Sequence, residues 1–359
     1  PYKERNMPKT AINTDFVQRA LKQITENDHG IRHLDKLQEW ITQCSDTEAT
    51  SINLYRLSES WGVDIRELTA LFLWATKFGL FDLHWNIRCP MCNGKTENHD
   101  SLGHMHSGSH CVMCKSDFVC ELDNTIEVTF SISGNVRPLP ENVAEEKCGP
   151  ADQRLNGFQI INSPIFRKYF SDELLSEQEN LSVRHVAIMF TDLKGSTQMY
   201  QQLGDARAFK IVRQHFDLLE QAIHAHGGVI VKTIGDAVMA SFAKTSEAVG
   251  AAIDAQKQFR TFNESMQLQD GVTIRIGIHV GNSLMVTLNN RLDYFGTMVN
   301  IAARVEALGD GNEILITRNV FDDLGVKNEL LSRAQSIQPF TARLKGIRDE
   351  QKVMKVVYN

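Results

Sequence analysis

The sequence lacks an apolar run long enough to cross a membrane. The best candidate, residues 68–83, is interrupted by Thr76, Lys77 and Asp82. A spanning helix needs about 20 predominantly apolar residues. No secretory leader is recognisable at the start of the chain either. We therefore expect a cytoplasmic protein without a membrane span.

The chain also lacks a large excess of charge of one sign. Its 38 Lys and Arg against 44 Asp and Glu give a formal net charge of −6. Such a balance gives no general reason to expect nucleic acid or an acidic membrane as a partner. Its length of 359 residues, 42% of them hydrophobic, is enough for two or more domains with cores of their own.

Cysteine is scarce and grouped. Four of the seven cysteines lie in two CxxC pairs, which favours a reducing compartment over a disulfide scaffold. The pairs are Cys89–Cys92 and Cys111–Cys114, and the 18 residues between them are typical of a zinc ribbon. Four thiolates make a closed, structural zinc site, and metal binding contributes on the order of 10 kcal/mol to such a small unit.

Two alternatives stay open around these pairs. One CxxC pair alone is also a redox motif. The loop between the pairs carries four histidines, any of which can replace a cysteine ligand: His99, His104, His106 and His110. Cys120, after the second pair, is expected to be a buried thiol.

The N-terminal half divides into four segments. Residues 1–50 have helical spacing and carry no recognisable chemistry. Residues 51–84 predict helix, tight turn, helix, with Asp64 capping the second helix, which resembles a helix-turn-helix. Arg66 and Lys77 are balanced by acidic neighbours, so we expect packing rather than DNA binding. The predicted zinc ribbon covers 85–137, and 138–182 are rich enough in Pro, Gly and charge to predict a linker.

The rest of the chain, 183–359, is organised around Asp192. A short apolar run with Val186 and Ile188 predicts a buried strand that ends at this residue. A turn with Gly195 follows, and then Ser196 and Thr197, which can cap a helix. The residues expected to bind substrate at this helix start are Leu193, Gly195, Ser196 and Thr197. A carboxylate beside backbone N–H groups of this kind suits a metal-bound phosphate.

A second carboxylate follows at Asp236. Residues 202–226 read as one amphipathic helix, and 229–233 and 237–242 as two strands joined at 234–236. Such a hairpin can place Asp236 beside Asp192. The two carboxylates would repel unless a divalent cation lay between them.

These motifs resemble class III nucleotidyl cyclases. The match is carried by FTDL at 190–193, KTIGD at 232–236, LDYFG at 292–296 and VNIAAR at 299–304. The resemblance implies that Asp192 and Asp236 hold two magnesium or manganese ions. It also implies that Lys232 and Asp293 read adenine. The helix-turn-helix and ribbon together resemble a module found ahead of some bacterial cyclase domains.

The resemblance assigns three further residues. Asn300 and Arg304 stabilise the transition state, and Lys345, followed by glycine, binds the triphosphate. The spacing agrees with the first assignment, because residues four apart share a helix face. An amide and a guanidinium there suit the ribose and the phosphate oxygens.

The base-reading pair favours adenine. A lysine donor and a carboxylate acceptor complement adenine N1 and the exocyclic amine, whereas guanine presents the opposite pattern. One departure from the family lies in residues 284–290, which lack the glycines that often occur there.

The sequence thus predicts an α+β protein, with a helical segment and a small zinc ribbon ahead of a ferredoxin-like class III cyclase catalytic domain. The expected function is a metal-dependent adenylyl cyclase that makes 3′,5′-cyclic AMP and pyrophosphate from ATP. The resemblance implies a site between two catalytic domains, and since this chain has one such domain with both sets of residues, we expect a head-to-tail homodimer. The zinc module is expected to be regulatory, with an unidentified regulator. The alternatives are a catalytically silent cyclase-like sensor, which binds a partner, and a guanylyl cyclase.

Overall fold

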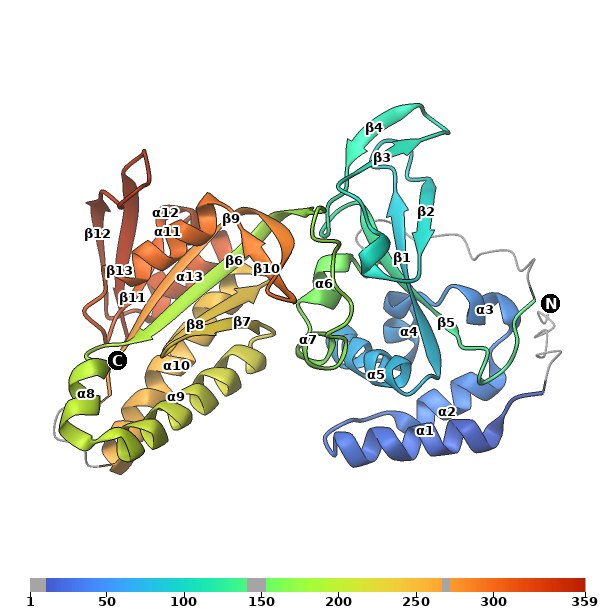
Figure 1. The fold of residues 1–359 in the computed structure, drawn as a ribbon, viewed down its shortest axis with the longest axis horizontal. Helices are drawn as coiled ribbons and strands as arrows, with labels where there is room; N and C mark the ends of the chain where they lie inside the picture. Colours follow the sequence, from blue (N-terminus) through green and yellow to red (C-terminus); the bar gives the residue numbers. More distant parts are fainter. Residues whose placement is uncertain (1–10, 141–152, 267–271, 359) are drawn as a thin grey trace. The chain divides into compact units, whose positions relative to one another are not determined.

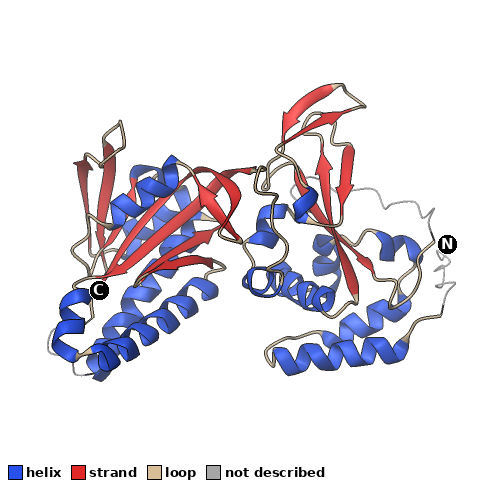
Figure 2. Cartoon of the chain, in the orientation of Figure 1, coloured by secondary structure: helices blue, strands red, loops and turns tan. Residues whose placement is uncertain are grey.

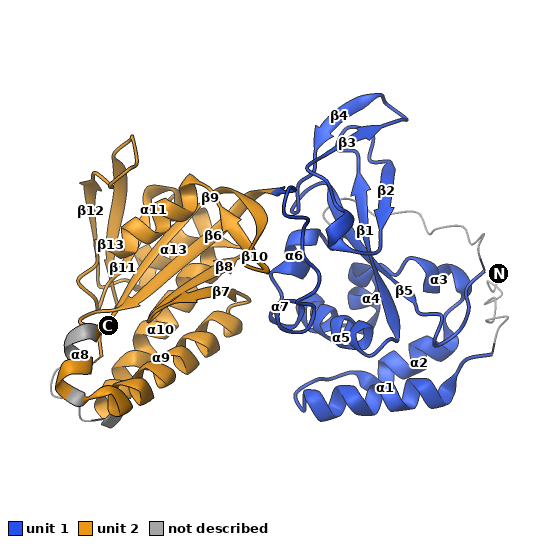
Figure 3. Cartoon of the chain, viewed as in Figure 1, with its two compact units in different colours: residues 1–181 blue, residues 182–359 orange. Residues whose placement is uncertain are grey.

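The computed structural model describes residues 11–140, 153–266 and 272–358. The chain divides into two compact units, unit 1 at residues 1–181 and unit 2 at 182–359 (Figures 1 and 3). The division falls within one residue of the start predicted for the catalytic domain.

Unit 1 begins with helices. They are α1 (Thr14–Asn27), α2 (Leu34–Gln43), α3 (Asp46–Thr50), α4 (Leu54–Trp61) and α5 (Ile65–Lys77). The turn between α4 and α5 has Gly62 at φ 63°, where glycine avoids the cost of a Cβ. The Asp64 side chain accepts hydrogen bonds from the N–H groups of Arg66 and Glu67 at the start of α5, as predicted.

A small sheet follows the helices. Strand β1 (Phe81–Arg88) lies between β2 (Lys95–His99) and β5 (Ile126–Ile132), and both pairings are antiparallel. The short helix η1 (Leu102–His104) and the hairpin of β3 (Gly108–Cys111) and β4 (Ser116–Val119) lie between β2 and β5 in sequence. The first CxxC pair, Cys89–Cys92, lies directly after β1. The second pair, Cys111–Cys114, lies at the turn of the β3–β4 hairpin.

The predicted linker is partly folded. Residues 141–152 of it lie outside the described part, but α6 (Gly157–Ile161) and α7 (Pro164–Tyr169) fall inside the predicted range. Their apolar side chains Phe158, Ile161 and Phe166 are buried, and the N–H of Val128 in β5 donates to the carbonyl of Leu155. This stretch therefore belongs to unit 1, because its apolar residues complete that unit's core.

Unit 2 is built on one mixed sheet (Figure 2). Its first strands are β6 (Leu181–Leu193), β7 (Val229–Ile234), β8 (Ala237–Phe242) and β9 (Ile274–Leu288). They lie in the order β9-β6-β8-β7, which is the arrangement of a ferredoxin-like βαββαβ core and confirms the predicted fold class. The other strands are β10 (Arg291–Phe295), β11 (Ile314–Thr317), β12 (Ser336–Ala342) and β13 (Gln351–Val357). Strand β10 pairs with β9, and the order β12-β13-β11 extends the sheet beyond β9.

Helices cover both faces of this sheet. Helices α9 (Asp205–Ala225), α10 (Thr245–Met266) and α13 (Leu324–Arg333) share a core with Ile314 and Ile316. Helix α11 (Thr297–Glu306) packs with Leu315. Since successive residues of a strand point to opposite faces, α11 covers the face opposite α9 and α10.

Three details differ from the sequence-based expectation. The predicted helix 202–226 is α9, which begins at Asp205 after Gly204 at φ 73°; a separate helix, α8 (Ser196–Leu203), precedes it, and Phe209 is exposed rather than buried. Strand β9 extends to Leu288, and the glycine-free hairpin turns at Asn289 and Asn290, at φ 50° and 55°. Asparagine tolerates this left-handed conformation, so the hairpin needs no glycine there. Strand β12, α12 (Arg318–Phe321) and α13 were not predicted.

Within the described residues, no helix combines the length and the apolarity needed to cross a bilayer.

Candidate functional site

Asp192 lies near the carboxyl end of β6, one residue before the strand ends. Burial raises the pKa of this carboxyl group, and the neighbouring Asp236 carboxylate raises it further, whereas Arg275 lowers it. The two aspartates, 44 positions apart in sequence (236 − 192), are therefore electrostatic neighbours in the fold, as predicted.

Asp236 follows Gly235 in the turn between the antiparallel strands β7 and β8. Its Oδ2 atom is buried and has no hydrogen-bond partner among the described residues. A buried carboxylate oxygen without a donor is costly, and its neighbour is a second carboxylate. A divalent cation with oxygen ligands would satisfy both groups, so these residues fit a magnesium or manganese site.

The turn after Asp192 differs from the prediction in its cap. Helix α8 starts at Ser196, and its cap residue is Gly195 at φ 72°, without a side-chain cap bond. The Lys194 N–H donates to the carbonyl of Thr273 in the same unit, and the Leu193 side chain is buried. Leu193 can therefore offer a ligand only its backbone. The side chain of Thr197 lies outside the described part.

Lys232 and Asp293 meet in the fold. The Lys232 ammonium, on β7, donates a hydrogen bond to Asp293 Oδ2, on β10. The second carboxylate oxygen, Oδ1, accepts the N–H of Tyr294 at 2.8 Å. The Asp293 side chain is only 9% exposed, compared with 30% for Lys232. The two residues therefore form a fixed donor–acceptor pair, of the kind expected for reading a base.

The remaining three predicted residues lie elsewhere. Asn300 and Arg304 are both exposed on α11, which covers the opposite sheet face from α9 and α10. Lys345 is exposed in the connection between β12 and β13. These strands lie at the end of the sheet opposite the β7–β8 hairpin that carries Asp236.

Sequence reasoning missed two charged residues near the aspartates. Arg275 on β9 places Nη1 3.7 Å from Asp192 Oδ2. Glu306 at the end of α11 is 9% exposed, and its Oε1 has no partner in the described part. Burial, and then the Asp192 carboxylate, raise the pKa of Glu306 to about 7. A charged residue within the apolar alternation of residues 272–280 was the available signal for Arg275.

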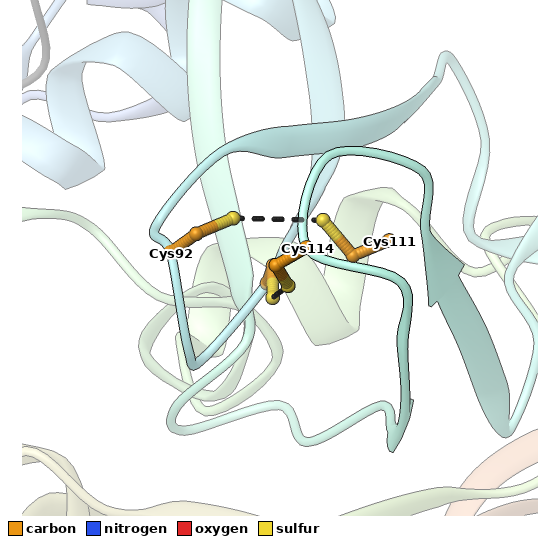
Figure 4. A group of neighbouring side chains, drawn as sticks. Cys92, Cys111 and Cys114 are labelled. Carbon is orange, nitrogen blue, oxygen red and sulfur yellow. Dashed lines mark hydrogen bonds between the residues drawn. The ribbon is translucent and has the colours of Figure 1, made fainter.

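Unit 1 contains the second candidate site. The Sγ atoms of Cys89, Cys92, Cys111 and Cys114 all lie within 4.8 Å of one another (Figure 4). Each pair forms a loop whose backbone N–H groups donate to its first sulfur, Met91 and Cys92 to Cys89, and Met113 and Cys114 to Cys111. Four thiolates supported in this way fit a tetrahedral zinc ion.

Three histidines of the intervening loop have carboxylate partners: His99 pairs with Glu97, His106 with Glu179 and His110 with Asp117. The ring of the fourth, His104, lies 6.5 Å from that of His99. Cys120 is fully buried, and burial raises the pKa of its thiol to about 12. The cluster in the described part therefore consists of the four cysteines.

Comparisons with known proteins agree with this division of the chain. Residues 179–353 match the family model for the adenylate and guanylate cyclase catalytic domain. Residues 13–146 match a second family model, described as a family of unknown function (DUF5939).

Two curated relatives match part of the chain. An adenylate cyclase of Anabaena cylindrica is 35% identical over 157 residues, which cover 40% of this chain and 31% of that protein. An adenylate cyclase of Mycosarcoma maydis is 32% identical over 161 residues, which cover 40% of this chain and 6% of that protein. The chain thus spans less than a third of the length of either relative.

Among solved structures, the adenylyl cyclase CyaB from P. aeruginosa has a TM-score of 0.43 and 22% identity. That match covers 50% of this chain and 97% of the other. The family match places an adenylate and guanylate cyclase catalytic domain at residues 179–353, and the ferredoxin-like strand order of unit 2 agrees with it.

Proposed function

We propose that this protein is an adenylyl cyclase, which converts ATP to 3′,5′-cyclic AMP and pyrophosphate at a site shared by two chains. The observation that carries the proposal is the pair Asp192 and Asp236, with a buried oxygen that lacks a donor. The two curated relatives are both adenylate cyclases, which supports ATP as the substrate.

Asp192 and Asp236 would hold two divalent cations. When bound, such cations lower the pKa of the ribose 3′-hydroxyl and neutralise charge on the leaving pyrophosphate. The backbone around Gly195 and Ser196, at the start of α8, would face the phosphates. Leu193 and Thr197 flank these residues and complete the proposed turn.

Lys232 and Asp293 would bind adenine. Their hydrogen bond holds the ammonium and the carboxylate side by side, so one edge of the base can meet a donor and an acceptor together. Guanine would place a donor against the ammonium, and a buried mismatch of this kind is costly.

Asn300, Arg304 and Lys345 would act on the ribose and the phosphates. An amide can orient the ribose, and a guanidinium can stabilise charge on the equatorial phosphate oxygens in the transition state. In a single chain these side chains are exposed on other elements than the aspartates. In the proposed head-to-tail homodimer, each site takes the aspartates from one chain and the other set from its partner.

The four-cysteine cluster would hold a structural zinc ion and keep the ribbon folded. We assign the ribbon a regulatory role because its fold carries no catalytic residues of the cyclase site.

The test is cyclic nucleotide production by the purified chain, given ATP or GTP with Mg²⁺ or Mn²⁺. We expect cyclic AMP from ATP, and a loss of at least about 100-fold in Asp236→Ala, because the two-cation site then loses half of its protein ligands. Glu220→Ala, which removes an exposed carboxylate on α9, is the matched control and should keep full activity.

The other outcomes are informative. Cyclic GMP from GTP would contradict the adenine assignment. No product from either nucleotide, with intact metal binding, would favour a silent sensor over an enzyme.

A further inference from the structure

The four cysteines of the ribbon are not evenly spaced. Cys89 Sγ lies 3.5 Å from Cys114 Sγ, and Cys92 Sγ lies 3.5 Å from Cys111 Sγ. Both close pairs join one CxxC loop to the other, as the dashed line between Cys92 and Cys111 shows (Figure 4). A disulfide has a sulfur–sulfur distance of about 2.05 Å, so small side-chain rotations would close either pair.

Each close pair also joins an exposed cysteine to a buried one. Cys92 and Cys114 are exposed, whereas Cys89 and Cys111 are buried. An oxidant from solvent therefore reaches the exposed sulfur of each pair first, and the buried sulfur of the same pair lies next to it. An accessible thiolate with an adjacent resolving cysteine is the arrangement of thiol oxidation sensors.

We propose that the four-cysteine cluster is an oxidation site for hydroperoxides, which closes into the disulfides Cys89–Cys114 and Cys92–Cys111 and releases the zinc ion. The inference rests on the proposed zinc site and is independent of cyclase activity. Zinc is lost because a disulfide sulfur carries no negative charge and is a poor ligand.

The chemistry balances for each pair. The Cys92 thiolate attacks hydrogen peroxide, the O–O bond breaks, an S–O bond forms and hydroxide leaves, which gives a sulfenic acid. The Cys111 thiolate then attacks this sulfur, the S–S bond forms, the S–O bond breaks and a second hydroxide leaves. The two sulfurs lose two electrons, and one peroxide becomes two hydroxides, which take up two protons. Cys114 and Cys89 react in the same way with a second peroxide.

Oxidation would also disturb the rest of unit 1. Asn93, directly after Cys92, accepts a hydrogen bond at Oδ1 from Arg154 Nη1 at 2.6 Å. Arg88 Nη1 donates to the Asn93 carbonyl at 3.3 Å. Arg88 and Arg154 both pair with the buried Glu127 of β5. A change in the first CxxC loop therefore reaches the segment that leads into α6.

The experiment treats the zinc-loaded full chain with hydrogen peroxide. Zinc is measured before oxidation and as it is released, by a colorimetric chelator. The disulfides are mapped by mass spectrometry of peptides from the unreduced protein. We expect one zinc ion released per chain, with Cys89 linked to Cys114 and Cys92 to Cys111. A thiol reductant should restore the four thiols and, with them, zinc binding.

The internal control is Cys120, which is buried and should stay a thiol. Sulfoxides at the exposed Met91 and Met113 are recognised because the thiol reductant does not reverse them. In Cys92→Ser only the Cys89–Cys114 disulfide should form, and the mapping of the unaltered chain remains valid if this variant does not fold.

Three results would overturn the proposal. They are retention of zinc and free thiols under peroxide, disulfides within the loops (Cys89–Cys92 and Cys111–Cys114), or disulfides between chains. Absence of zinc before oxidation would refute the zinc site instead, and the disulfide map would still test the pairing.

Discussion

Two acidic side chains of unit 2, Asp192 and Glu306, have raised pKa values, and burial is the largest cause for both. Asp236 also raises the pKa of Asp192, and both aspartates raise that of Glu306, while Arg275 acts in the opposite direction. Such crowding destabilises a fold and persists where function needs it. At the residue scale, the proposed cation site is therefore a place where the crowded charges lower the stability of the fold.

The substitution Glu306→Gln should change how the free energy of unfolding of unit 2 depends on pH. The folded-state pKa of Glu306, about 7, lies above its ordinary value of 4.5, so the folded chain keeps a proton that the unfolded chain releases. Stability present below pH 4.5 is therefore lost as pH rises toward 7. At about 1.4 kcal/mol per pKa unit, the neutral glutamine should stabilise unit 2 by up to about 3 kcal/mol at pH 8.

The measurement is the free energy of unfolding at pH 4.5 and pH 8, without added Mg²⁺ or Mn²⁺. All four tryptophans, at positions 40, 61, 74 and 85, lie in unit 1, so their fluorescence separates its unfolding from that of unit 2. An equal change in the free energy of unfolding on Glu306→Gln at the two pH values would refute the raised pKa of Glu306.

At the scale of elements, α11 depends on one glycine of the strand beneath it. A Cβ at Gly277 in β9 would overlap the backbone N and Cα of Glu306 in α11. The helix can therefore approach the sheet closely only over glycine. This contact sets the distance between α11 and the sheet, and therefore the positions of Asn300 and Arg304 on that helix.

Gly277→Ala should push α11 away from the sheet. We expect a loss of roughly 2 kcal/mol or more in the stability of unit 2, because the backbone of a packed helix cannot yield cheaply. Cyclase activity should fall as well. Gly281→Ala is the control, since its Cβ would lie 3.4 Å from the nearest atom, Met298 Cβ. Thermal unfolding compares the two variants, and equal unfolding temperatures would contradict the argument.

The CxxC loops are the second element whose order depends on one interaction. Removing zinc with a chelator should leave four crowded thiols and loosen Asn93 from Arg88 and Arg154. We expect unit 1 to lose several kcal/mol, about 10 °C in its unfolding temperature at 2–4 °C per kcal/mol. Tryptophan fluorescence reports this directly, because Trp85 is buried in β1, four residues before Cys89. An unchanged unfolding temperature would show that zinc is not structural.

At the scale of the whole molecule, the site is incomplete in one chain if the proposed dimer is correct. The aspartates belong to β6 and the β7–β8 hairpin, while Asn300 and Arg304 are exposed on α11. A dimer would unite the two sets twice, once in each of two equivalent sites.

Mixing Asp192→Ala chains with Asn300→Ala chains should therefore restore activity. Half of randomly formed dimers are mixed, and each mixed dimer has one intact site of two, so about a quarter of the parent activity is expected. The control mixes Asn300→Ala with Arg304→Ala. Both changes lie on α11, no combination yields an intact site, and activity should stay at background. Recovery in the control, or none in the first mixture, would exclude shared sites.

Local signals in the sequence predicted much of this structure. Apolar alternation located β6, β7, β8 and the first part of β9, and Asp64 was predicted as a cap, because these features depend on neighbours in sequence. The start of α9 was predicted three residues too early, because the apolar spacing that indicates the helix does not mark its first residue. The burial of 155–166 in unit 1 was missed because composition describes a linker without its contacts.

What the sequence by itself determined was the chemistry: two aspartates, a lysine and an aspartate, an asparagine and an arginine, and four cysteines at ribbon spacing. These candidate site residues are recognised by residue type and by spacing along the chain, and both can be read from the sequence. The tertiary structure alone decided which charges meet. It set Arg275 and Glu306 beside the aspartates, joined Lys232 to Asp293 and paired each exposed cysteine with a buried one. The physical reason is that electrostatics and sulfur chemistry act over a few ångströms, and residues far apart in sequence reach that range only when the sheet and its helices pack.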